Sequence, residues 1–491
     1  MREISWWKTA YAVCVLCAAT AIALPAQTFT TLFSFDGTDG ALPEAALVQG
    51  TDGNLYGTTW IGGANGGACN GGCGTVFKIS LSGTLTTLYS FCSLGGRACT
   101  DGAAPEAGLV EGADGSFYGT TPAGGSTGAN AGTVFKISPS GTLTTLYSFC
   151  PQGDGCIDGF GPIGSLVQAT DGNFYGTTSE GGDGSGTIFK ITPVGVLTTL
   201  YTFVCSEHGC PDGEIPEGAL IQASDGNFYG TTTDGGAYGL GTIFETTPSG
   251  NLTTLYSFCS QIGCADGKEP TAGLAQSVSG NFYGTTPFGG NSTCTYGCGT
   301  VFKITPSGVL TTLQSFSGAD GAGPYGELIR ATNGNFYGTT SYDGAKDSGT
   351  IFKITPSGAL TTLYSFCSQS GCADGDGPLA ALVQDTNGKF YGTTAGGGAN
   401  LYGTVFSLSV GLGPFVETRP TAATVGKPIN IVGSSLVGAT SVTFNGTPAT
   451  FTVESSSLIR TTVPSGATTG TVQVVTPGGT LTSNVPFRVL P

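Results

Sequence analysis

The sequence predicts an all-β protein: a seven-bladed β-propeller of four-stranded blades, with an N-terminal strand closing the last blade, followed by a C-terminal β-sandwich. The main observation is the motif [FL]-Y-G-T-T, which occurs seven times at spacings of 62, 57, 54, 54, 54 and 54 residues. Such a period indicates one structural unit copied in tandem, whose copies stack to bury their faces. Composition agrees, because 85 glycines without a three-residue period and 10% aromatic residues are typical of a turn-rich, folded β protein.

Residues 1–26 have the features of a secretory signal peptide. Arg2 and Lys8 lie near the N-terminus, an apolar run follows over residues 10–24, and Ala26 offers a small residue before a cleavage site. The run is too short to span a bilayer comfortably. We therefore expect a protein that is exported and cleaved, and that is secreted, bound at the cell surface or periplasmic. A retained N-terminal anchor is the alternative.

The chain is acidic, with a formal net charge of −16 at pH 7. Nucleic acids and anionic membranes both attract lysine and arginine, so this charge disfavours both partners. We expect no nucleic-acid partner, and no membrane insertion once the signal peptide is removed.

One period, residues 109–149, contains four candidate strands in order. They are an apolar segment, the Tyr-Gly-Thr-Thr segment, a Gly-Thr-[VI]-Phe segment and a Leu-Thr-Thr-Leu-Tyr segment, at residues 108–111, 117–121, 132–137 and 143–149. Asp114-Gly115 joins the first two strands as a hairpin turn, and Pro139-Ser140-Gly141 joins the last two. Four antiparallel strands per period are the unit of a β-propeller blade.

The strand count predicts how the propeller closes. The fourth kind of strand occurs seven times, but its first copy, residues 29–35, precedes every other strand, and none follows residue 406. We therefore expect residues 30–35 to pair with residues 403–408 as the outer strand of the last blade, which removes open sheet edges. Tight turns then lie on one face, and the glycine-rich loops and cysteine-bearing crossovers lie on the other, where binding residues gather.

The repeat units resemble a known family. Leu-Thr-Thr-Leu-Tyr at 197–201, Asp-Gly-Asn-Phe-Tyr-Gly-Thr-Thr at 225–232 and Gly-Thr-Val-Phe-Lys-Ile at 299–304 are similar to the Gloeo-Verruco (GloVer) tandem repeat of exported bacterial proteins. The resemblance covers about residues 29–410. It implies a repeat domain, assigned to residues 27–410, in an exported protein, and it implies no particular activity.

A second pattern replaces the period after residue 410. Short candidate strands alternate with Gly and Pro turns, which predicts a β-sandwich over residues 411–491. Its segments resemble the IPT/TIG group of immunoglobulin-like domains, notably Gly-Lys-Pro-Ile-Asn-Ile-Val-Gly at 426–433, Val-Thr-Phe-Asn-Gly at 442–446, Val-Pro-Ser-Gly-Ala at 463–467 and Val-Gln-Val-Val-Thr-Pro-Gly-Gly at 472–479. The resemblance implies an accessory or spacer module.

Fourteen cysteines follow the signal segment, in seven close pairs. An even count behind an export signal indicates disulfides, each closing a short loop. A metal site is the alternative, but Cys-x2-Cys spacing is absent and the chain has one histidine. The expected pairs are Cys69/Cys73, Cys92/Cys99, Cys150/Cys156, Cys205/Cys210, Cys259/Cys264, Cys294/Cys298 and Cys367/Cys372.

Every period carries Asp-Gly-x-x-Pro just before its first strand, beginning with Asp39, Asp101, Asp158, Asp212, Asp266, Asp320 and Asp374. We interpret each as a turn residue whose side chain folds back on its own backbone. A Ca²⁺ site is the alternative, with Asp36 and Asp39, or Asp374 and Asp376, as oxygen ligands, although no full Ca²⁺ loop pattern is present. No other metal or cofactor is expected.

The loops after the Tyr-Gly-Thr-Thr strands carry aromatic residues among Gly, Asn and Ser. They are Trp60, Tyr238, Phe288, Tyr296, Tyr342 and Tyr402. Aromatic side chains on exposed loops favour recognition, so we expect a non-catalytic binding or adhesion module for extracellular polysaccharide or a cell-surface partner. The alternative is that these rings simply cover the blades below them.

A carboxylate-dependent, glycan-degrading enzyme is the second functional class. The acidic residues that interrupt the repeat are its candidate residues, namely Glu214, Glu217, Glu245 and Glu269. Each is more commonly a solvated surface charge. Serine–histidine catalysis is disfavoured, because His208 lies in a short loop between two cysteines. A purely structural role in an envelope or matrix is the third class.

Overall fold

The computed structural model describes residues 27–65, 69, 71–94, 99–126, 128–151, 155–182, 184–207, 209–290 and 294–491. The expected signal segment and His208 lie outside these residues. Strands dominate the described chain, in which the helical segments are two 3₁₀ turns, η1 (Ile262–Cys264) and η2 (Ser370–Cys372). None of its helices is long and apolar enough to cross a membrane.

Residues 28–409, as far as they are described, form seven four-stranded antiparallel sheets. The first strands are β2 (Val48–Gln49), β6 (Val110–Glu111), β10 (Val167–Gln168), β14 (Ile221–Gln222), β18 (Ala275–Gln276), β22 (Ile329–Arg330) and β26 (Val383–Gln384). The second strands are β3 (Leu55–Thr59), β7 (Phe117–Thr121), β11 (Phe174–Thr178), β15 (Phe228–Thr232), β19 (Phe282–Thr286), β23 (Phe336–Thr340) and β27 (Phe390–Thr394).

The third strands are β4 (Thr75–Ile79), β8 (Thr133–Ile137), β12 (Thr187–Ile191), β16 (Thr242–Thr246), β20 (Thr300–Ile304), β24 (Thr350–Ile354) and β28 (Thr404–Ser409). The fourth strands are β5 (Leu85–Ser90), β9 (Leu143–Ser148), β13 (Leu197–Thr202), β17 (Leu252–Ser257), β21 (Leu310–Ser315), β25 (Leu360–Ser365) and, in the last sheet, β1 (Thr28–Ser34).

The N-terminal strand completes the last sheet, as the strand count predicted. The strand order there is β1-β28-β27-β26, and β1 runs antiparallel to β28, with Phe29 opposite Leu408 and Ser34 opposite Thr404. The ring of Phe29 stacks on Tyr364 of the preceding sheet, with centroids 3.9 Å apart. The edge of β28 is therefore paired rather than open.

The third strand of each sheet explains the Tyr-Gly-Thr-Thr motif. A side chain on Gly57 would meet the Phe77 ring at 2.6 Å, and the six equivalent glycines face a phenylalanine at 2.5–2.7 Å. The buried hydroxyls of Thr59 and Thr75 lie 2.9 Å apart, and the six equivalent pairs are 2.8–2.9 Å apart. Glycine leaves room for the ring, and the two threonines satisfy each other's hydrogen bonds.

Consecutive sheets pack through a recurring aromatic contact. The ring of Tyr56 stacks on Phe117 of the next sheet at 3.9 Å, and five equivalent Tyr–Phe pairs lie 4.0–4.3 Å apart. Between the last and first sheets, Tyr391 shares a buried cluster with Leu55. The repeated stacking of four-stranded sheets is a propeller-like arrangement.

Neighbouring sheets are also joined by the last residue of each first strand. Gln168 Oε1 accepts a hydrogen bond at 3.1 Å from the backbone N–H of Ala113 in the preceding sheet. Gln222, Gln276, Gln384 and Gln49 accept at 2.9–3.0 Å from the N–H groups of Thr170, Ser224, Thr332 and Thr386. Two sheets have another residue at this position. Glu111 still accepts the Thr51 N–H, at 3.1 Å, whereas Arg330 has no acceptor atom to offer.

The C-terminal part consists of two four-stranded sheets and a parallel pair of strands. One sheet is ordered β29 (Val416–Arg419), β31 (Pro428–Gly433), β35 (Leu458–Thr462), β34 (Phe451–Val453). The other is ordered β33 (Thr447–Pro448), β32 (Ser441–Phe444), β36 (Val472–Thr476), β37 (Gly479–Thr482). The parallel pair is β30 (Ala422–Thr424) and β38 (Arg488–Leu490).

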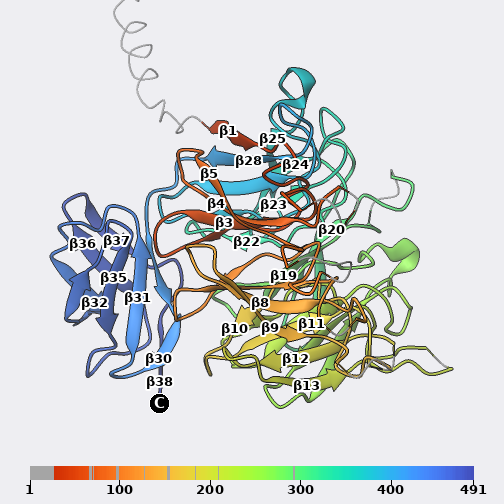
Figure 1. The fold of residues 1–491 in the computed structure, drawn as a ribbon, viewed down its shortest axis with the longest axis horizontal. Helices are drawn as coiled ribbons and strands as arrows, with labels where there is room; N and C mark the ends of the chain where they lie inside the picture. The colour runs from red at the N-terminus through yellow and green to blue at the C-terminus, as the bar shows by residue number, and fades with distance from the viewer. Residues whose placement is uncertain are drawn as a thin grey trace, which may run out of the picture.

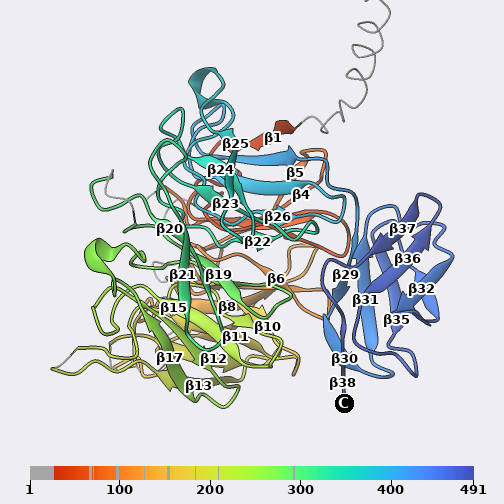
Figure 2. The ribbon, with the colours of Figure 1, turned by 180° about the vertical axis from the view of Figure 1, so that it is seen from behind.

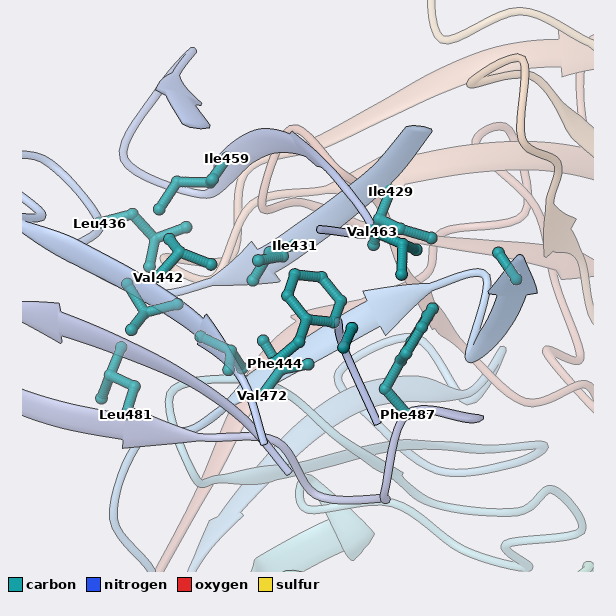
Figure 3. Close-up of a cluster of buried hydrophobic side chains, with 14 residues drawn as sticks. Ile429, Ile431, Leu436, Val442, Phe444, Ile459, Val463, Val472, Leu481 and Phe487 are labelled. Carbon is teal, nitrogen blue, oxygen red and sulfur yellow. The ribbon is translucent and has the colours of Figure 1, made fainter. Parts of the chain in front are cut away.

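A single apolar core lies between these two sheets (Figure 3). Ile431 of β31 and Val472 of β36 are fully buried in it, and the Phe444 and Phe487 rings meet edge-to-face with centroids 5.1 Å apart. Alternate residues of β36 are buried and exposed, as expected for a sheet with one solvated face. The sandwich predicted for this segment is therefore present.

The C-terminal sandwich packs against the tight-turn face of the repeat sheets. Figures 1 and 2 both show it, in blue, on the side of the molecule opposite the long loops. Ser457 Oγ donates to the carbonyl oxygen of Thr51 at 2.8 Å, and the backbone N–H of Phe415 donates to that of Thr386 at 2.9 Å. One face of the repeat region is thus covered, while the loop face lies on the opposite side.

Candidate functional site

The aspartates of the Asp-Gly-x-x-Pro units tie each crossover to the preceding strand. Asp101 Oδ2 accepts hydrogen bonds from the Tyr89 hydroxyl at 2.7 Å and from the backbone N–H of Ser93 at 2.9 Å. Asp266 accepts equivalent bonds from Tyr256 and Ser260. The interpretation of these aspartates as simple turn residues therefore needs a correction. Their carboxylates accept hydrogen bonds from the segment upstream of the turn, because the tyrosine of the preceding fourth strand reaches them.

The candidate Ca²⁺ ligands take part in similar contacts. Asp36 Oδ1 accepts from the Thr38 N–H at 2.8 Å, and Asp39 Oδ1 accepts from the Asp36 N–H at 3.0 Å. Asp374 is fully buried and accepts from the Tyr364 hydroxyl at 2.7 Å. Asp376 pairs with Gly396 through the backbone. The carboxylates of Asp36, Asp39 and Asp374 thus already accept hydrogen bonds within their own loops or from the strand that precedes them.

All seven expected cysteine pairs are disulfides within the described chain, and each spans four to seven residues. The bridges join Cys69 to Cys73, Cys92 to Cys99, Cys150 to Cys156, Cys205 to Cys210, Cys259 to Cys264, Cys294 to Cys298 and Cys367 to Cys372. They lie in the loops and crossovers outside the strands.

Cys156 pairs with Cys150 as predicted, with Cα atoms 4.4 Å apart. Its carbonyl oxygen also accepts the backbone N–H groups of Gly159 and Gly182, each at 2.9 Å, and its φ of 37° is in the left-handed region. Cys156 thus also ties its crossover to the glycine-rich loop that follows β11, as Cys99, Cys210, Cys264 and Cys372 do in their sheets.

Three groups of potential metal ligands occur among the described residues, and each contains both cysteines of one disulfide. The third member is Cys99, Glu214 or Asp343. Oxidised cysteines are not thiolate ligands, so the disulfide interpretation accounts for these groups.

Four aromatic side chains form a continuous row on the loop face of the fifth and sixth sheets. The Phe288 ring lies 6.4 Å from Tyr296 and 6.0 Å from Tyr325, and Tyr325 lies 6.1 Å from Tyr342, all edge-to-face. Tyr296 is 70% exposed and Tyr342 is 53% exposed. The row therefore presents ring surface to solvent.

A lysine and a glutamate flank this aromatic row. Lys268 Nζ lies 5.8 Å from the centroid of Phe288 and 6.0 Å from that of Tyr296, within cation–π range. The same Nζ pairs with Glu269 at 3.1 Å. Burial raises the pKa of Tyr325 to about 12, and the charge of Glu269 contributes to the shift. Glu269 thus lies close to the row.

Carboxylates continue from the aromatic row around the loop face. Burial raises the pKa of Glu44 to about 7, and the charge of Glu106 adds to the shift. Burial also raises the pKa of Glu106, with a contribution from Glu217, and that of Glu217, with a contribution from Asp234. Thr233 Oγ1 donates to Glu217 Oε2 at 3.1 Å. We call this group the loop-face site, and its members are Glu44, Glu106, Glu217, Asp234, Glu269, Phe288, Tyr296, Tyr325 and Tyr342.

Three of the six aromatic candidates belong to this site and three do not. Phe288, Tyr296 and Tyr342 belong to the row. Trp60, Tyr238 and Tyr402 are 36%, 55% and 45% exposed, and none makes a ring–ring contact with another described residue. They occupy the corresponding loops of other sheets.

The acidic candidates also divide between the two faces. Glu217 and Glu269 belong to the loop-face site, and Glu214 lies near it, because burial and the charge of Asp234 raise its pKa. Glu245 lies at the other end of its sheet, where Oε1 accepts a hydrogen bond from the Asn227 side chain at 2.5 Å, beside the Asp-Gly turn. Glu245 is therefore not part of a carboxylate pair with the others.

Sequence analysis missed Glu44, Glu106, Asp234 and Tyr325. Asp234 lies in the loop after β15, and the other three follow the proline of Asp-Gly-x-x-Pro, a position that reads Glu, Glu, Ile, Glu, Thr, Tyr, Leu in the seven periods. The motif was recognised from its repeated Asp, Gly and Pro residues, whereas Glu44, Glu106 and Tyr325 stand at the variable position that follows the proline. Comparing the periods position by position could have found it.

The opposite face holds a cavity of about 330 Å³, where Val48, Val110, Val167 and Ile221 from four first strands meet residues 417–421 of the sandwich. Arg419 Nη1 contacts Glu111 Oε2 at 2.5 Å and donates to the Gln49 carbonyl oxygen at 2.7 Å. Glu111 is one of the two departures from glutamine described above. The glutamate that replaces glutamine in this sheet therefore forms the ion pair with Arg419 of the sandwich.

These features define a propeller-like repeat protein with an appended immunoglobulin-like sandwich. The chain belongs to the Gloeobacter/Verrucomicrobia repeat family, whose model matches residues 19–157, 152–294, 206–406 and 291–447. The model of the IPT/TIG domain matches residues 417–489. Both resemblances noted in the sequence are confirmed.

Solved structures with related shape share little sequence with the chain. A structural genomics protein of unknown function from Bacteroides thetaiotaomicron has 15% identity over 78% of this chain and 76% of its own, with a TM-score of 0.40. An auxiliary nutrient binding protein from the same species has 12% identity over 78% and 76%, with a TM-score of 0.39. A luciferin-regenerating enzyme has 10% identity over 79% and 98%, with a TM-score of 0.40. No curated protein matches the sequence.

Proposed function

We propose that the protein binds an extracellular polysaccharide at the loop-face site without cleaving it. The observation that carries the proposal is the row Tyr296–Phe288–Tyr325–Tyr342, because its exposed rings lie beside carboxylates on one face. Aromatic rings offer flat apolar surface to the C–H faces of sugars, and carboxylates accept hydrogen bonds from sugar hydroxyls. A cell-surface glycan or glycoprotein would present the same groups.

The proposal includes a closed ring of seven blades. Three contacts support closure between the last and first sheets: Gln49 with Thr386, the Thr393 hydroxyl with the Ala45 carbonyl oxygen at 3.3 Å, and Tyr391 with Leu55. Each has counterparts between the other neighbouring sheets. A closed ring fixes the loop ends, so that residues from different blades can act as one binding surface.

We also propose that the protein is exported. Seven disulfides among the described residues fit an oxidising compartment, because cytosolic reductants keep thiols reduced. Extracellular, cell-surface and periplasmic locations all meet this condition.

Glycan hydrolysis is the second candidate, and Glu44 is the observation that favours it. A carboxyl group with a pKa of about 7 is about half protonated at neutral pH, and its protonated form can act as a general acid. The charge of Glu106 contributes to the raised pKa of Glu44. Hydrolysis that is lost in Glu44→Gln would support this function over simple binding.

Glycan-array binding of the mature protein tests the main proposal. We expect selective retention of one class of polysaccharide, lost in a Tyr296/Tyr325/Tyr342 triple Ala variant that keeps its β-sheet circular dichroism. A Trp60/Tyr238/Tyr402 triple Ala variant is the matched control, since it removes as many exposed aromatic rings outside the site. No binding to any glycan, or equal loss in both variants, would contradict the proposal.

A further inference from the structure

A second cavity, on the face opposite the loop-face site, carries positive charge. It has a volume of about 420 Å³ and lies between the tight turns of the third to sixth sheets and residues of the C-terminal sandwich. Among the described residues that line it are Arg330 and Arg488 but no aspartate or glutamate. The chain as a whole has a net charge of −16, so this local excess of cations is a specific feature.

Arg330 stands where other sheets have a glutamine that caps the neighbouring turn. At the equivalent positions, glutamine Oε1 accepts the N–H of Ser224 or Thr332 at 3.0 Å. A guanidinium has no acceptor, so the N–H of Val278 receives no such cap within the described structure. Arg330 and Val278 both line the cavity, and Val278 is 72% exposed. An arginine side chain and a turn with an uncapped N–H group therefore both border the cavity.

The Arg330 guanidinium makes no hydrogen bond or ion pair with any residue that the structure describes, whereas each of the other arginines of β29, β35 and β38 does. Burial lowers its pKa, and no carboxylate opposes that effect. An arginine nevertheless stays charged in proteins. A partly buried guanidinium that lacks a counter-ion can bind an anionic group from a ligand.

Arg488 completes the wall of the cavity from the sandwich side. Its Nη1 donates to the backbone carbonyl oxygens of Ser224 and, at 3.4 Å, Ala223 in the fourth sheet. This anchoring holds a second positive charge at the cavity while joining the two parts of the chain. The charge is fixed in position before any ligand arrives, which lowers the cost of binding.

We propose that this cavity is a binding site for a small ligand that carries an oxyanion, held by Arg330 and the Val278 N–H with Arg488 contributing charge. A guanidinium binds carboxylate and phosphate oxygens through paired hydrogen bonds, and a backbone N–H adds a third donor. The carboxylate of an acidic sugar and free phosphate offer the same chemistry. The site is independent of the proposed polysaccharide surface, which lies at the other face.

Isothermal titration calorimetry of the full mature chain with D-glucuronate, inorganic phosphate and D-glucose tests the proposal. We expect glucuronate or phosphate to bind, glucose not to bind, and binding to weaken as ionic strength rises. Preference for glucuronate would identify an acidic saccharide as the source of the oxyanion, and preference for phosphate would identify the free anion.

Arg330→Gln is the informative variant, because it restores the residue that most other sheets carry and so should fold normally. We expect it to weaken oxyanion binding at least about tenfold, since a charge-assisted hydrogen bond is lost. Arg330→Met, which keeps the length of the side chain without its charge, should behave alike, and Arg460→Gln on the sandwich surface is the control. Absence of binding to both anions, or unchanged binding in both Arg330 variants, would overturn the proposal.

Discussion

Gln49 and Thr386 join the first and last sheets although 337 residues separate them in sequence. Gln49 Oε1 accepts the Thr386 N–H at 3.0 Å, and Gln49 Nε2 donates to the Thr386 hydroxyl at 2.9 Å. Gln49 is 3% exposed, so neither bond has water as a ready substitute. The contact repeats the one between consecutive sheets elsewhere, and it lies at the seam of the proposed closed ring.

Gln49→Ala should weaken this seam. It leaves the Thr386 N–H without its acceptor, at a cost of about 1–3 kcal/mol in the free energy of unfolding. Urea unfolding measures the loss, and hydrogen exchange should rise in β26–β28 and β2. Gln168→Ala is the control, because it removes the equivalent bond between the second and third sheets. Equal exchange patterns in the two variants would count against a specific seam.

Arg419→Ala should release the C-terminal sandwich from the repeat sheets. Glu111, whose side chain is 3% exposed, would lose its counter-ion, and breaking such a buried pair costs about 3 kcal/mol. Limited proteolysis should then cut between Ser409 and Val416, where the two parts are linked. The double variant Glu111→Gln/Arg419→Ala should recover part of the loss, because glutamine occupies the position in most sheets. Unaltered proteolysis in the single variant would refute this role.

Tyr325→Ala should weaken polysaccharide binding more than Tyr238→Ala. Tyr325 contacts both Phe288 and Tyr342, so its loss divides the aromatic row, whereas Tyr238 lies outside it. An aromatic contact contributes about 1 kcal/mol beyond its buried area, which predicts a several-fold rise in Kd. Titration with the glycan selected by the array measures both values. A larger effect of Tyr238→Ala would contradict the prediction and would indicate that the polysaccharide binds to other loops.

Glu327→Gln should change how stability depends on pH. Burial raises the pKa of Glu327 to about 7, and an added side chain on Gly273 would meet its carboxylate at 2.9 Å. The folded state then holds a proton that the unfolded state releases near pH 4.5, so stability falls as pH rises from about 4.5 to 7.

The variant removes that dependence. It should match the wild type near pH 4.5 and be more stable at pH 7.5 by on the order of 2 kcal/mol in urea unfolding. Glu454→Gln, at an exposed carboxylate of the sandwich, is the control for a general effect of charge. A constant difference between Glu327→Gln and the wild type at all pH values would exclude the explanation.

Reduction of the disulfides should disturb the structure of the loop face but leave the β-sheets intact. Every bridge lies outside the strands, so circular dichroism should keep its β signal while glycan binding falls. Peptide mapping without reductant should recover seven local pairs. Cys73 and Cys99, from different pairs, have sulfur atoms 3.9 Å apart, which makes this the place to look for an exchanged bridge. A bridge between two different sheets would contradict the pairing.

The repeat by itself determined much of the fold. Tyr-Gly-Thr-Thr recurs because each copy meets the same neighbours, so the strand order, the pairing of β1 with β28 and the local cysteine pairs could all be inferred from spacing. Local hydrogen bonding and a constant period suffice for these, since each depends on residues within one unit or on a count of units. The backbone contacts of Cys156 could not be inferred in this way, because they depend on how the crossover folds onto the next loop.

Only the tertiary structure decided which side chains act together. Glu44, Glu106 and Tyr325 are far apart in sequence, and stacking of the sheets brings them to one face, whereas Trp60 and Tyr402 stay outside although their loops have the same kind of sequence. Docking of the sandwich through Arg419 and Glu111, and the cavity with Arg330, depend equally on contacts between units. Repeat sequence specifies the unit, but the groups that meet between units are fixed by packing over long separations, and no local pattern encodes them.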